Sequence, residues 1–231
     1  GYRVDIKHFT IVATGGMYVK VEPSQATVTI DSTATDTGIF NNPVFLQNLL
    51  PGPHTITITK PGYFDYKKTL EINQNQVTKL EYVTLFKKSP VFDVLPATAQ
   101  SPASLISPDG QKIVLCNDHE ISYAQAPFDF TQDKPFDPAQ GKQFLNRFSE
   151  TIKDCQWLNN DYVIFTLNNT ITISEIDTRG NINIVSLPST YAKASADKQA
   201  FIPTKIQFNQ SDKKLYILTE NTTLVSERLL P

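Results

Sequence analysis

Three histidines, at positions 8, 54 and 119, are the side chains of this sequence best suited to act as a base or a nitrogen ligand near neutral pH. Nucleophilic catalysis would need one of them beside an activated Ser, Thr or Cys, and no nucleophile-elbow sequence is present. His54 follows Pro-Gly-Pro in a turn and is interpreted as structural, and His8 indicates no role. His119 could bind a metal ion with Asp118 and Glu120, but sequence neighbours on alternating faces rarely converge on one ion. A solvated turn is therefore favoured, and no metal site is predicted.

Three acidic residues, Asp109, Asp161 and Asp212, could supply the paired carboxylates of a glycoside hydrolase. They occupy equivalent positions in a repeated turn, however, where a carboxylate accepts hydrogen bonds from its own backbone. The sequence also has no GxGxxG or GxxxxGK[ST] segment that would cradle a phosphate. These patterns predict a protein that is not an enzyme and that needs no cofactor.

The two cysteines, Cys116 and Cys155, both lie among apolar, strand-like residues. They are far apart in the sequence and form no CxxC pair, so they lack the four ligands of a zinc site. Buried free thiols are the favoured interpretation, because free Cys is among the most buried residue types. A disulfide is the alternative.

An aromatic group after a Pro-Gly turn contains the candidates for binding. Tyr63, Phe64 and Tyr66 could stack on a sugar or pack against a partner protein, although alternation along a strand places at least one of them in the core. The single tryptophan, Trp157, begins a strand-like segment and is expected to anchor a core.

The composition is that of a strand-rich globular protein. Of the 231 residues, 40% are hydrophobic and 19% are charged, and Thr, Ile and Val are abundant. The net charge is −2 and no dense Lys/Arg run is present, so nucleic acid is not an expected partner. No apolar run approaches the roughly 18 residues of a membrane span. We expect any membrane attachment to come from an upstream N-terminal helix that is not part of this sequence.

Residues 1–86 are predicted to form the first domain, with strands at 18–21, 26–31, 54–60 and 77–86. Three segments in it carry family signals: Val-Glu-Pro-Ser-Gln-Ala-Thr-Val-Thr-Ile-Asp at 21–31, Leu-Pro-Gly-Pro-His-Thr-Ile at 50–56, and Lys-Pro-Gly-Tyr at 60–63. Together they resemble a PEGA domain, a small β-sandwich of bacterial cell envelopes that often follows a membrane helix. The namesake Pro-Glu-Gly-Ala is Pro-Ser-Gln-Ala here, and the loop between Asp31 and Leu49 is longer than in the family.

Residues 87–103 are predicted to be a linker with one short strand at 91–95, and residues 104–231 contain a weak repeat. A polar turn followed by an apolar strand recurs at Ser107, Asn159 and Asn209, with spacings of 52 and 50 residues. These units resemble the repeats of TolB-like and WD-type β-propellers. About three copies are fewer than the four to eight blades of a closed ring, so an incomplete propeller is expected.

Two segments of the repeat region are predicted to be surface insertions. Residues 126–145 contain two near-identical eight-residue units, at 128–135 and 136–143. Residues 190–201 contain a run of small residues that could form one short helix. Neither segment has a sustained helical or strand periodicity.

The predicted fold class is all-β: a small PEGA-type sandwich followed by an incomplete propeller-like repeat region. The resemblance implies a non-enzymatic, extracytoplasmic protein of the bacterial cell envelope that acts as a structural or protein-interaction module. Recognition of peptidoglycan or another glycan by the sandwich is one alternative. An accessory role in a larger propeller-containing hydrolase is another. The expected partner is a protein or a cell-wall component.

Overall fold

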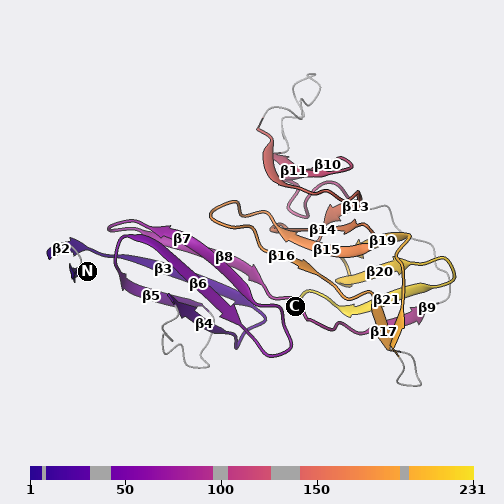
Figure 1. Ribbon diagram of the computed structural model, residues 1–231, viewed down its shortest axis with the longest axis horizontal. Helices are drawn as coiled ribbons and strands as arrows, with labels where there is room; N and C mark the ends of the chain where they lie inside the picture. Colours follow the sequence, from indigo (N-terminus) through magenta and orange to yellow (C-terminus); the bar gives the residue numbers. More distant parts are fainter. Residues whose placement is uncertain (7–8, 32–42, 96–103, 126–140, 193–197) are drawn as a thin grey trace. The chain divides into compact units, whose positions relative to one another are not determined.

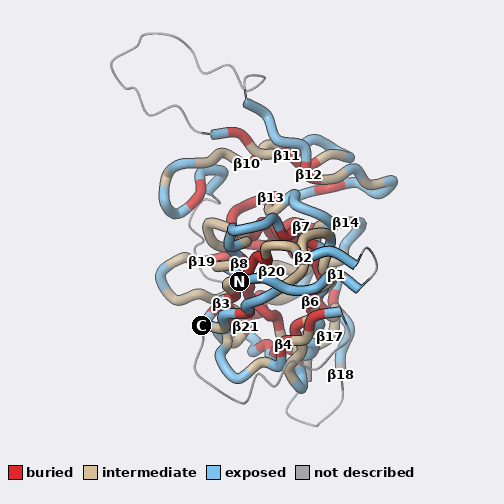
Figure 2. Tube along the Cα trace, turned by 90° about the vertical axis from the view of Figure 1, so that its left-hand side faces the viewer, coloured by how far each residue is buried: buried red, intermediate tan, exposed pale blue. Residues whose placement is uncertain are grey.

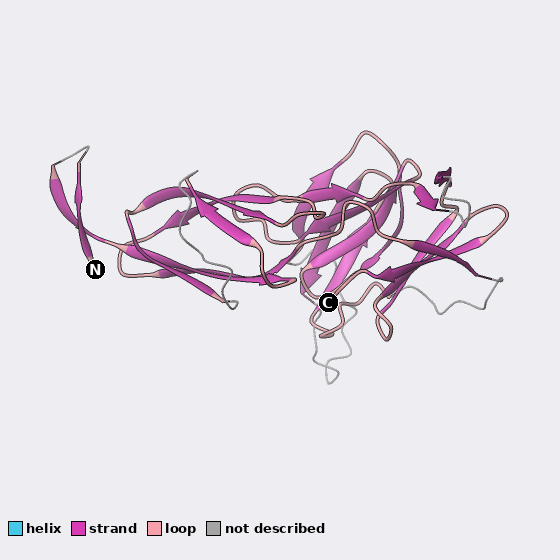
Figure 3. Cartoon of the chain, turned by 90° about the horizontal axis from the view of Figure 1, so that it is seen from below, coloured by secondary structure: helices cyan, strands magenta, loops and turns pink. Residues whose placement is uncertain are grey.

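The computed structural model describes residues 1–6, 9–31, 43–95, 104–125, 141–192 and 198–231. All regular elements in these ranges are β-strands, and no helix occurs among them (Figure 3). The all-β class predicted from the sequence is therefore confirmed. The chain divides into two compact units: the first comprises Gly1–Lys87, Arg179–Asn183 and Pro231, and the second Lys88–Thr178 and Ile184–Leu230.

The first unit contains two three-stranded sheets and an N-terminal hairpin (Figure 1). Its strands are β1 (Tyr2–Asp5), β2 (Thr10–Ala13), β3 (Gly15–Glu22), β4 (Thr27–Ile30), β5 (Val44–Leu49), β6 (Gly52–Thr59), β7 (Tyr66–Ile72) and β8 (Val77–Thr84). One sheet has the order β5-β3-β8, with β3 and β8 parallel, and the other has the antiparallel order β4-β6-β7. The hairpin consists of β1 and β2, which pair with each other.

Side chains from both sheets form the core of the first unit, because their strands alternate buried and exposed positions. In β6, Ile56 and Ile58 are completely buried, as the alternation of Thr and Ile predicts. On the other face, the hydroxyl oxygens of Thr55 and Thr69 lie 2.9 Å apart across β6 and β7. In Figure 2 the buried residues of the chain are coloured red.

The predicted strands of the first unit are all present, with different ends. The strand predicted at 18–21 is the middle of β3, which begins at Gly15, and the strand predicted at 77–86 ends two residues earlier, as β8. The strands β5 and β7 were not predicted. Most of the long loop after Asp31, residues 32–42, lies outside the described residues.

The second unit consists of small antiparallel sheets formed mainly by consecutive strands (Figure 1). Its sheets have the orders β10-β11-β12, β13-β14-β15-β16, β17-β18 and β19-β20-β21-β9. The strands are β9 (Phe92–Leu95), β10 (Lys112–Cys116), β11 (Glu120–Gln125), β12 (Gln143–Arg147), β13 (Ile152–Trp157), β14 (Tyr162–Leu167), β15 (Thr170–Glu175), β16 (Ile184–Ser186), β17 (Thr190–Ala192), β18 (Lys198–Ala200), β19 (Lys205–Asn209), β20 (Lys214–Leu218) and β21 (Thr223–Arg228).

The three larger sheets correspond to the three predicted repeats. The first turn precedes β10, the second lies between β13 and β14, and the third lies between β19 and β20. The first strands of the sheets contact one another, β10 against β13 and β13 against β19. The described strands show no closed ring of sheets, so the propeller-like architecture stays a prediction.

The short strand at 92–95 belongs to the second unit and is not an isolated strand in a linker. β9 pairs antiparallel with β21, with Phe92 opposite Ser226 and Leu95 opposite Thr223. Phe92 is buried and its ring packs edge-on against Phe201, with the ring centroids 5.6 Å apart. The short strand predicted at 91–95 is present, but its partner was not predicted, because the pairing joins strands more than 120 residues apart and a local pattern cannot reveal that.

The insertion predictions are corrected where the structure describes them. Gln143–Leu145 belong to β12, which pairs with β11 and buries Leu145, so the inserted loop does not extend to residue 145. Thr190–Ala192 pair antiparallel with Lys198–Ala200, so these two segments of the predicted insertion are strands and not helix. Residues 126–140 and 193–197 lie outside the described residues. In the described parts of the chain, no helix is long and apolar enough to cross a membrane.

Candidate functional site

The first repeated turn is closed by its own side chains. The amide of Gly110 donates to the carbonyl of Ser107 at 2.7 Å, and Gly110 has φ +72°, a left-handed conformation that favours glycine. Oδ1 of Asp109 accepts from the Ser107 hydroxyl at 2.5 Å and from the amide of Gln111 at 2.9 Å. Asp109 is therefore a turn former, as predicted.

The second and third turns use different acceptors. Oδ1 of Asp212 accepts from the amide of Lys214 at 3.0 Å, which confirms the prediction for Asp212. In the second turn the acceptor is Asn159, whose Oδ1 receives the amides of Asp161 at 2.9 Å and Tyr162 at 2.8 Å. The prediction for Asp161 was wrong because Asn159, two residues earlier, already satisfies the turn. No hydrogen bond among the described residues reaches the Asp161 carboxylate.

The three turns lie side by side and form what we call the turn cluster: residues 107–112, 159–161 and 209–212. Oδ1 of Asn160 accepts from the amide of Asp109 at 2.9 Å, which joins the first turn to the second. Nε2 of Gln210 donates to the carbonyls of Trp157 at 3.1 Å and Leu158 at 3.3 Å, which joins the third turn to the second. The cluster therefore forms one polar surface contributed by three separate sheets.

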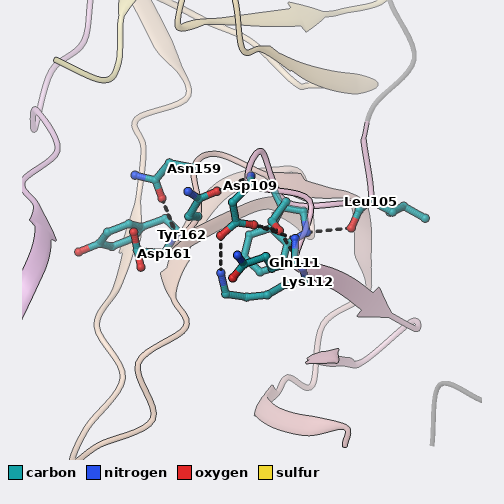
Figure 4. Close-up of polar contacts among 10 residues, drawn as sticks. Leu105, Asp109, Gln111, Lys112, Asn159, Asp161 and Tyr162 are labelled. Atoms are coloured by element: carbon teal, nitrogen blue, oxygen red, sulfur yellow. Dashed lines mark hydrogen bonds and ion pairs between the residues drawn. The ribbon is translucent and has the colours of Figure 1, made fainter. Parts of the chain in front are cut away.

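Charge in the turn cluster is centred on Lys112 (Figure 4). Its Nζ lies 3.1 Å from Oδ2 of Asp109. Burial acts to raise the pKa of Asp109, but hydrogen bonds from Ser107, Gln111 and Lys112 outweigh burial and lower it. Burial raises the pKa of Asp161 to about 6, although the nearby Lys112 opposes this change. The pKa of Asp161 is therefore shifted in the opposite direction from the pKa of Asp109 in the neighbouring turn.

Trp157 packs beneath the surface of the turn cluster, in contact with Lys112, and is a core residue, as predicted. It is almost completely buried, and its Nε1 donates to the carbonyl of Leu105 at 2.8 Å. The Nζ of Lys112 lies 5.8 Å from the centroid of the indole ring, within the range of a cation–π contact. The ring of Tyr123 packs edge-on against it at 6.4 Å. These contacts fix the base of the first two turns.

A cavity of about 470 Å³ lies between the first sheet of the second unit and β13. Its wall includes Cys116 and Cys155, which form a disulfide that joins β10 to β13. The Cα atoms of the pair are 6.4 Å apart, within the usual range for a disulfide. The favoured prediction of free thiols was wrong, because the two strands lie side by side although 39 positions separate the cysteines.

Side chains of β13 also bind the backbone of β19. Oε1 of Gln156 accepts from the amide of Phe208 at 2.9 Å, and its Nε2 donates to the carbonyl of Ile206 at 3.1 Å. Oδ2 of Asp154 accepts from the amide of Ile206 at 3.2 Å, and burial raises the pKa of Asp154. Gln156 is almost completely buried, so its amide takes the place of a paired strand. Sequence reasoning missed both residues, because the pattern within a single strand does not show which residue of another strand a polar side chain binds.

His119 is bound by backbone and not arranged with its neighbours as a metal site. Its Nδ1 lies 3.1 Å from the carbonyl oxygen of Glu150. Glu120 is held by Lys142 at 2.8 Å and by Arg147 at 2.9 Å, and these hydrogen bonds lower its pKa. Asp118, His119 and Glu120 all line an open depression of about 670 Å³. Among the described residues, no group of three His, Cys, Asp or Glu side chains is placed to hold a metal ion.

His54 is held by contacts with Asp31 and Leu50 in the first unit. Its Nδ1 lies 2.6 Å from Oδ2 of Asp31, and its Nε2 lies 2.7 Å from the carbonyl oxygen of Leu50. Oδ1 of Asp31 also accepts from the amide of Thr55 at 2.9 Å. The pair ties the residue that follows β4 to the start of β6, which agrees with the structural interpretation of His54. His8 lies outside the described residues.

The three aromatic candidates do not share one surface. Tyr66 is buried in the core of the first unit. Tyr63 packs partly against that core, and the Nζ of Lys60 lies 5.9 Å from the centroid of its ring. Phe64 is half-buried, and its amide donates to the carbonyl of Phe86 at 2.8 Å. Only Tyr63 and Phe64 therefore have surface that a ligand or partner could contact.

The first unit matches a known protein family. Residues 14–87 match the family model described as the PEGA domain. This segment covers both sheets of the first unit, so the resemblance seen in the three sequence segments is confirmed for that part of the chain. No curated protein matches the chain.

Proposed function

We propose that this chain is a non-enzymatic, extracytoplasmic protein in which the PEGA domain is a structural spacer and the repeat region binds a protein partner. The observation that carries this proposal is the match of residues 14–87 to the PEGA domain, a domain type that is typically extracellular or periplasmic. A membrane helix upstream would anchor it to the cell envelope.

The disulfide between Cys116 and Cys155 supports the location. Disulfides form and persist in oxidising compartments such as the periplasm and the cell surface, and they are rare in the cytosol. The disulfide lies in the second unit, outside the matched domain, and so it is an independent indication.

The repeat region is proposed to be propeller-like, with relatives among TolB-like and WD-type repeats. Its first strands contact one another in sequence order, β10 to β13 to β19, and β9 completes the last sheet from the opposite end of the region. Hydrogen bonds between neighbouring sheets join residues 50 to 53 positions apart, as between Asp154 and Ile206 and between Trp157 and Leu105. Such a constant step is expected when equivalent repeats stack in register.

The turn cluster is the proposed partner-binding surface. It combines amides, carboxylates and Lys112 from three sheets, and binding residues are often carried by loops that a rigid scaffold positions. The carboxylates of Asp109 and Asp212 are engaged by hydrogen bonds within their own turns, so we propose recognition rather than hydrolysis.

In-cell photo-crosslinking at matched positions tests this assignment. A photo-crosslinking amino acid replaces Ser211, which is exposed in the turn cluster, or Glu220, which is exposed in the turn at the far end of β20. We expect one discrete protein adduct from position 211 and none from position 220, in cells that export the chain. Adducts of equal yield from both positions, or from neither, would contradict the turn cluster as the binding surface.

Glycan recognition by the first unit is the second candidate, favoured by the partly exposed ring of Tyr63 beside Lys60. Co-sedimentation with purified peptidoglycan sacculi tests it. Retention that is lost on Tyr63→Ala but kept on Tyr82→Ala, an exposed tyrosine on β8, would favour the glycan function. If the parent chain is absent from the sacculus pellet, the glycan-binding function is ruled out.

A further inference from the structure

The strand that follows each repeated turn is β10 in the first sheet of the second unit, β14 in the second sheet and β20 in the third. Side chains alternate between the two faces of a sheet along each of these strands. The second and fourth residues of each strand define what we call the leading face: Ile113 and Leu115, Val163 and Phe165, Leu215 and Ile217. The third residue of each lies on the opposite, trailing face: Val114, Ile164 and Tyr216. The three sheets can therefore be compared face by face.

The trailing face of one sheet packs on the leading face of the next. Tyr123, on the trailing face of the first sheet, packs its ring against Trp157 on the leading face of the second. Gln156, on the trailing face of the second sheet, hydrogen-bonds the backbone of Ile206 and Phe208 in the third. In Figure 1 the sheets follow one another in this order, from β10 and β11 at the top to β20 and β21 below. The same type of contact therefore occurs twice within this chain.

The faces at the two ends of this row are more open than the faces inside it. On the leading face, the four residues of the second and third sheets are completely buried, whereas Ile113 and Leu115 of the first sheet are only half-buried. On the trailing face, Val114 and Ile164 are almost completely buried, whereas Tyr216 of the third sheet is half-buried. Burial is thus high where a neighbouring sheet covers the face and lower at the two ends of the row.

The open leading face of the first sheet is apolar. Ile106 joins it through its bridge with Ile113, and Phe144 joins it through the pairing of β12 with β11 and of β11 with β10. Ile106 is 48% exposed and Phe144 is 54% exposed. Trp157 and Phe208, which take the place of Ile106 in the second and third sheets, are only 2% and 5% exposed. The same position is therefore buried in both sheets that have a neighbour on this side.

We propose that the leading face of the first sheet docks onto the trailing face of the third sheet in a second copy of this chain. This contact continues the one that already joins the first sheet to the second and the second to the third. Two copies related by a two-fold axis form it twice, and their three larger sheets each make six, which is within the range of about four to eight blades of a closed propeller. The inference rests on the propeller-like architecture proposed above, and it does not depend on the partner of the turn cluster.

The area of the two contacts is sufficient for a stable dimer. A face of about four strands, about 4.8 Å apart and about five residues long at about 3.3 Å per residue, covers roughly 300 Å². Two contacts with two faces each therefore bury roughly 1,200 Å² in total, which is at the lower end of the range for stable interfaces.

Sedimentation equilibrium of the full chain tests the proposal. At about 100 µM, a concentration suited to an interface near the lower size limit, we expect a mass of twice the 25.9 kDa of one chain. Phe144→Glu places a charge on the open leading face, and Leu218→Glu places one on the open trailing face. Each variant alone should have the mass of one chain, with the dissociation constant raised by about tenfold or more, because the charge is buried without a partner in the dimer. The matched control is Tyr82→Glu, at an exposed aromatic residue of β8 in the first unit, and it should leave the dimer intact.

An equimolar mixture of the two glutamate variants shows whether unlike faces meet. In the mixture, the intact trailing face of the Phe144→Glu chain can dock onto the intact leading face of the Leu218→Glu chain, so we expect species of two chains to reappear. A parent chain that stays monomeric up to about 500 µM overturns the proposal. So does an unchanged dimer in either glutamate variant, loss of the dimer in the control, or a mixture that stays monomeric. None of these results alters the adduct expected from position 211, so the proposed function of the turn cluster is tested separately.

Discussion

Replacing Gln156 tests how the second unit holds its sheets together. The side-chain amide bridges the amide of Phe208 and the carbonyl of Ile206, and all three groups lie in the interior. Gln156→Met keeps the length and approximate shape of the side chain but removes both hydrogen bonds. Two buried backbone groups then lose their partners, and each unsatisfied group costs about 1–3 kcal/mol. Because the added thioether is apolar and offsets part of this loss, we expect the free energy of unfolding to fall by about 2–4 kcal/mol.

The assay is urea unfolding followed by tryptophan fluorescence. Trp157 is the only tryptophan of the chain and is buried in the second unit, so its emission reports on the unit that the change affects. With a urea dependence of about 2 kcal/mol per molar, the midpoint should fall by about 1–2 M. Gln143→Met, an exposed position at the start of β12, is the matched control and should change stability by less than about 0.5 kcal/mol. A loss below about 0.5 kcal/mol for Gln156→Met would refute the reasoning, because it would mean that the two backbone groups find other partners.

Three further predictions concern single features of the two units. Removal of the disulfide by Cys116→Ser with Cys155→Ser should lower the stability of the second unit by roughly 4 kcal/mol, because the bond closes a loop of 39 positions. The urea midpoint of this double variant should no longer change when a reductant is added. A double variant with the same urea midpoint as the parent chain contradicts this prediction. Asp161 has its folded pKa raised to about 6 by burial, so its contribution to stability is present below pH 4 and is lost as the pH rises towards 6. Asp161→Asn should therefore stabilise the second unit by roughly 1–2 kcal/mol at pH 7.5 and have little effect at pH 4, as measured by paired urea titrations; equal effects at both pH values would show that the carboxylate does not titrate in this range. Ile56→Ala removes a completely buried side chain from the first unit and should cost about 2–5 kcal/mol in thermal unfolding followed by far-ultraviolet circular dichroism; a smaller loss than that of Val77→Ala, which is exposed, would exclude Ile56 from the core.

The sequence correctly predicted the features that depend only on residues close together in the chain. The alternation of Thr and Ile at 55–59 fixed the inward face of β6, because a strand has only two faces. The Ser-Pro-Asp-Gly turn was recognised because Asp109 and Gly110 complete it within four residues. The PEGA resemblance also rests on short segments, and the match to residues 14–87 bears it out.

Features decided by distant partners were not predicted. The pairing of β9 with β21 turned a supposed linker into the fourth strand of a sheet. The Cys116–Cys155 disulfide depends on β10 and β13 lying side by side, and nothing near either cysteine indicates that. The predicted turn-forming role of Asp161 was wrong because of a residue close by. Asn159 already accepts the hydrogen bonds of the turn amides, so the Asp161 carboxylate is left near Lys112 with a raised pKa.

The spacing of the repeats nevertheless indicates which residues of neighbouring sheets contact each other, which the turn motifs alone do not. The turns recur after 52 and 50 residues, and the hydrogen bonds between neighbouring sheets join residues separated by nearly the same number: 51 for Asp109 with Asn160, 52 for Leu105 with Trp157, and 52 for Gln156 with Phe208. When repeats stack in register, a residue meets the equivalent region of the next repeat one period along the chain. A weak period of this kind therefore predicts specific partners, and a polar residue one period from an apolar strand, such as Gln156 before β19, becomes a candidate bridge between sheets. The partners of Gln156, Ile206 and Phe208, lie 50 and 52 positions along the chain, which is one period of the repeat.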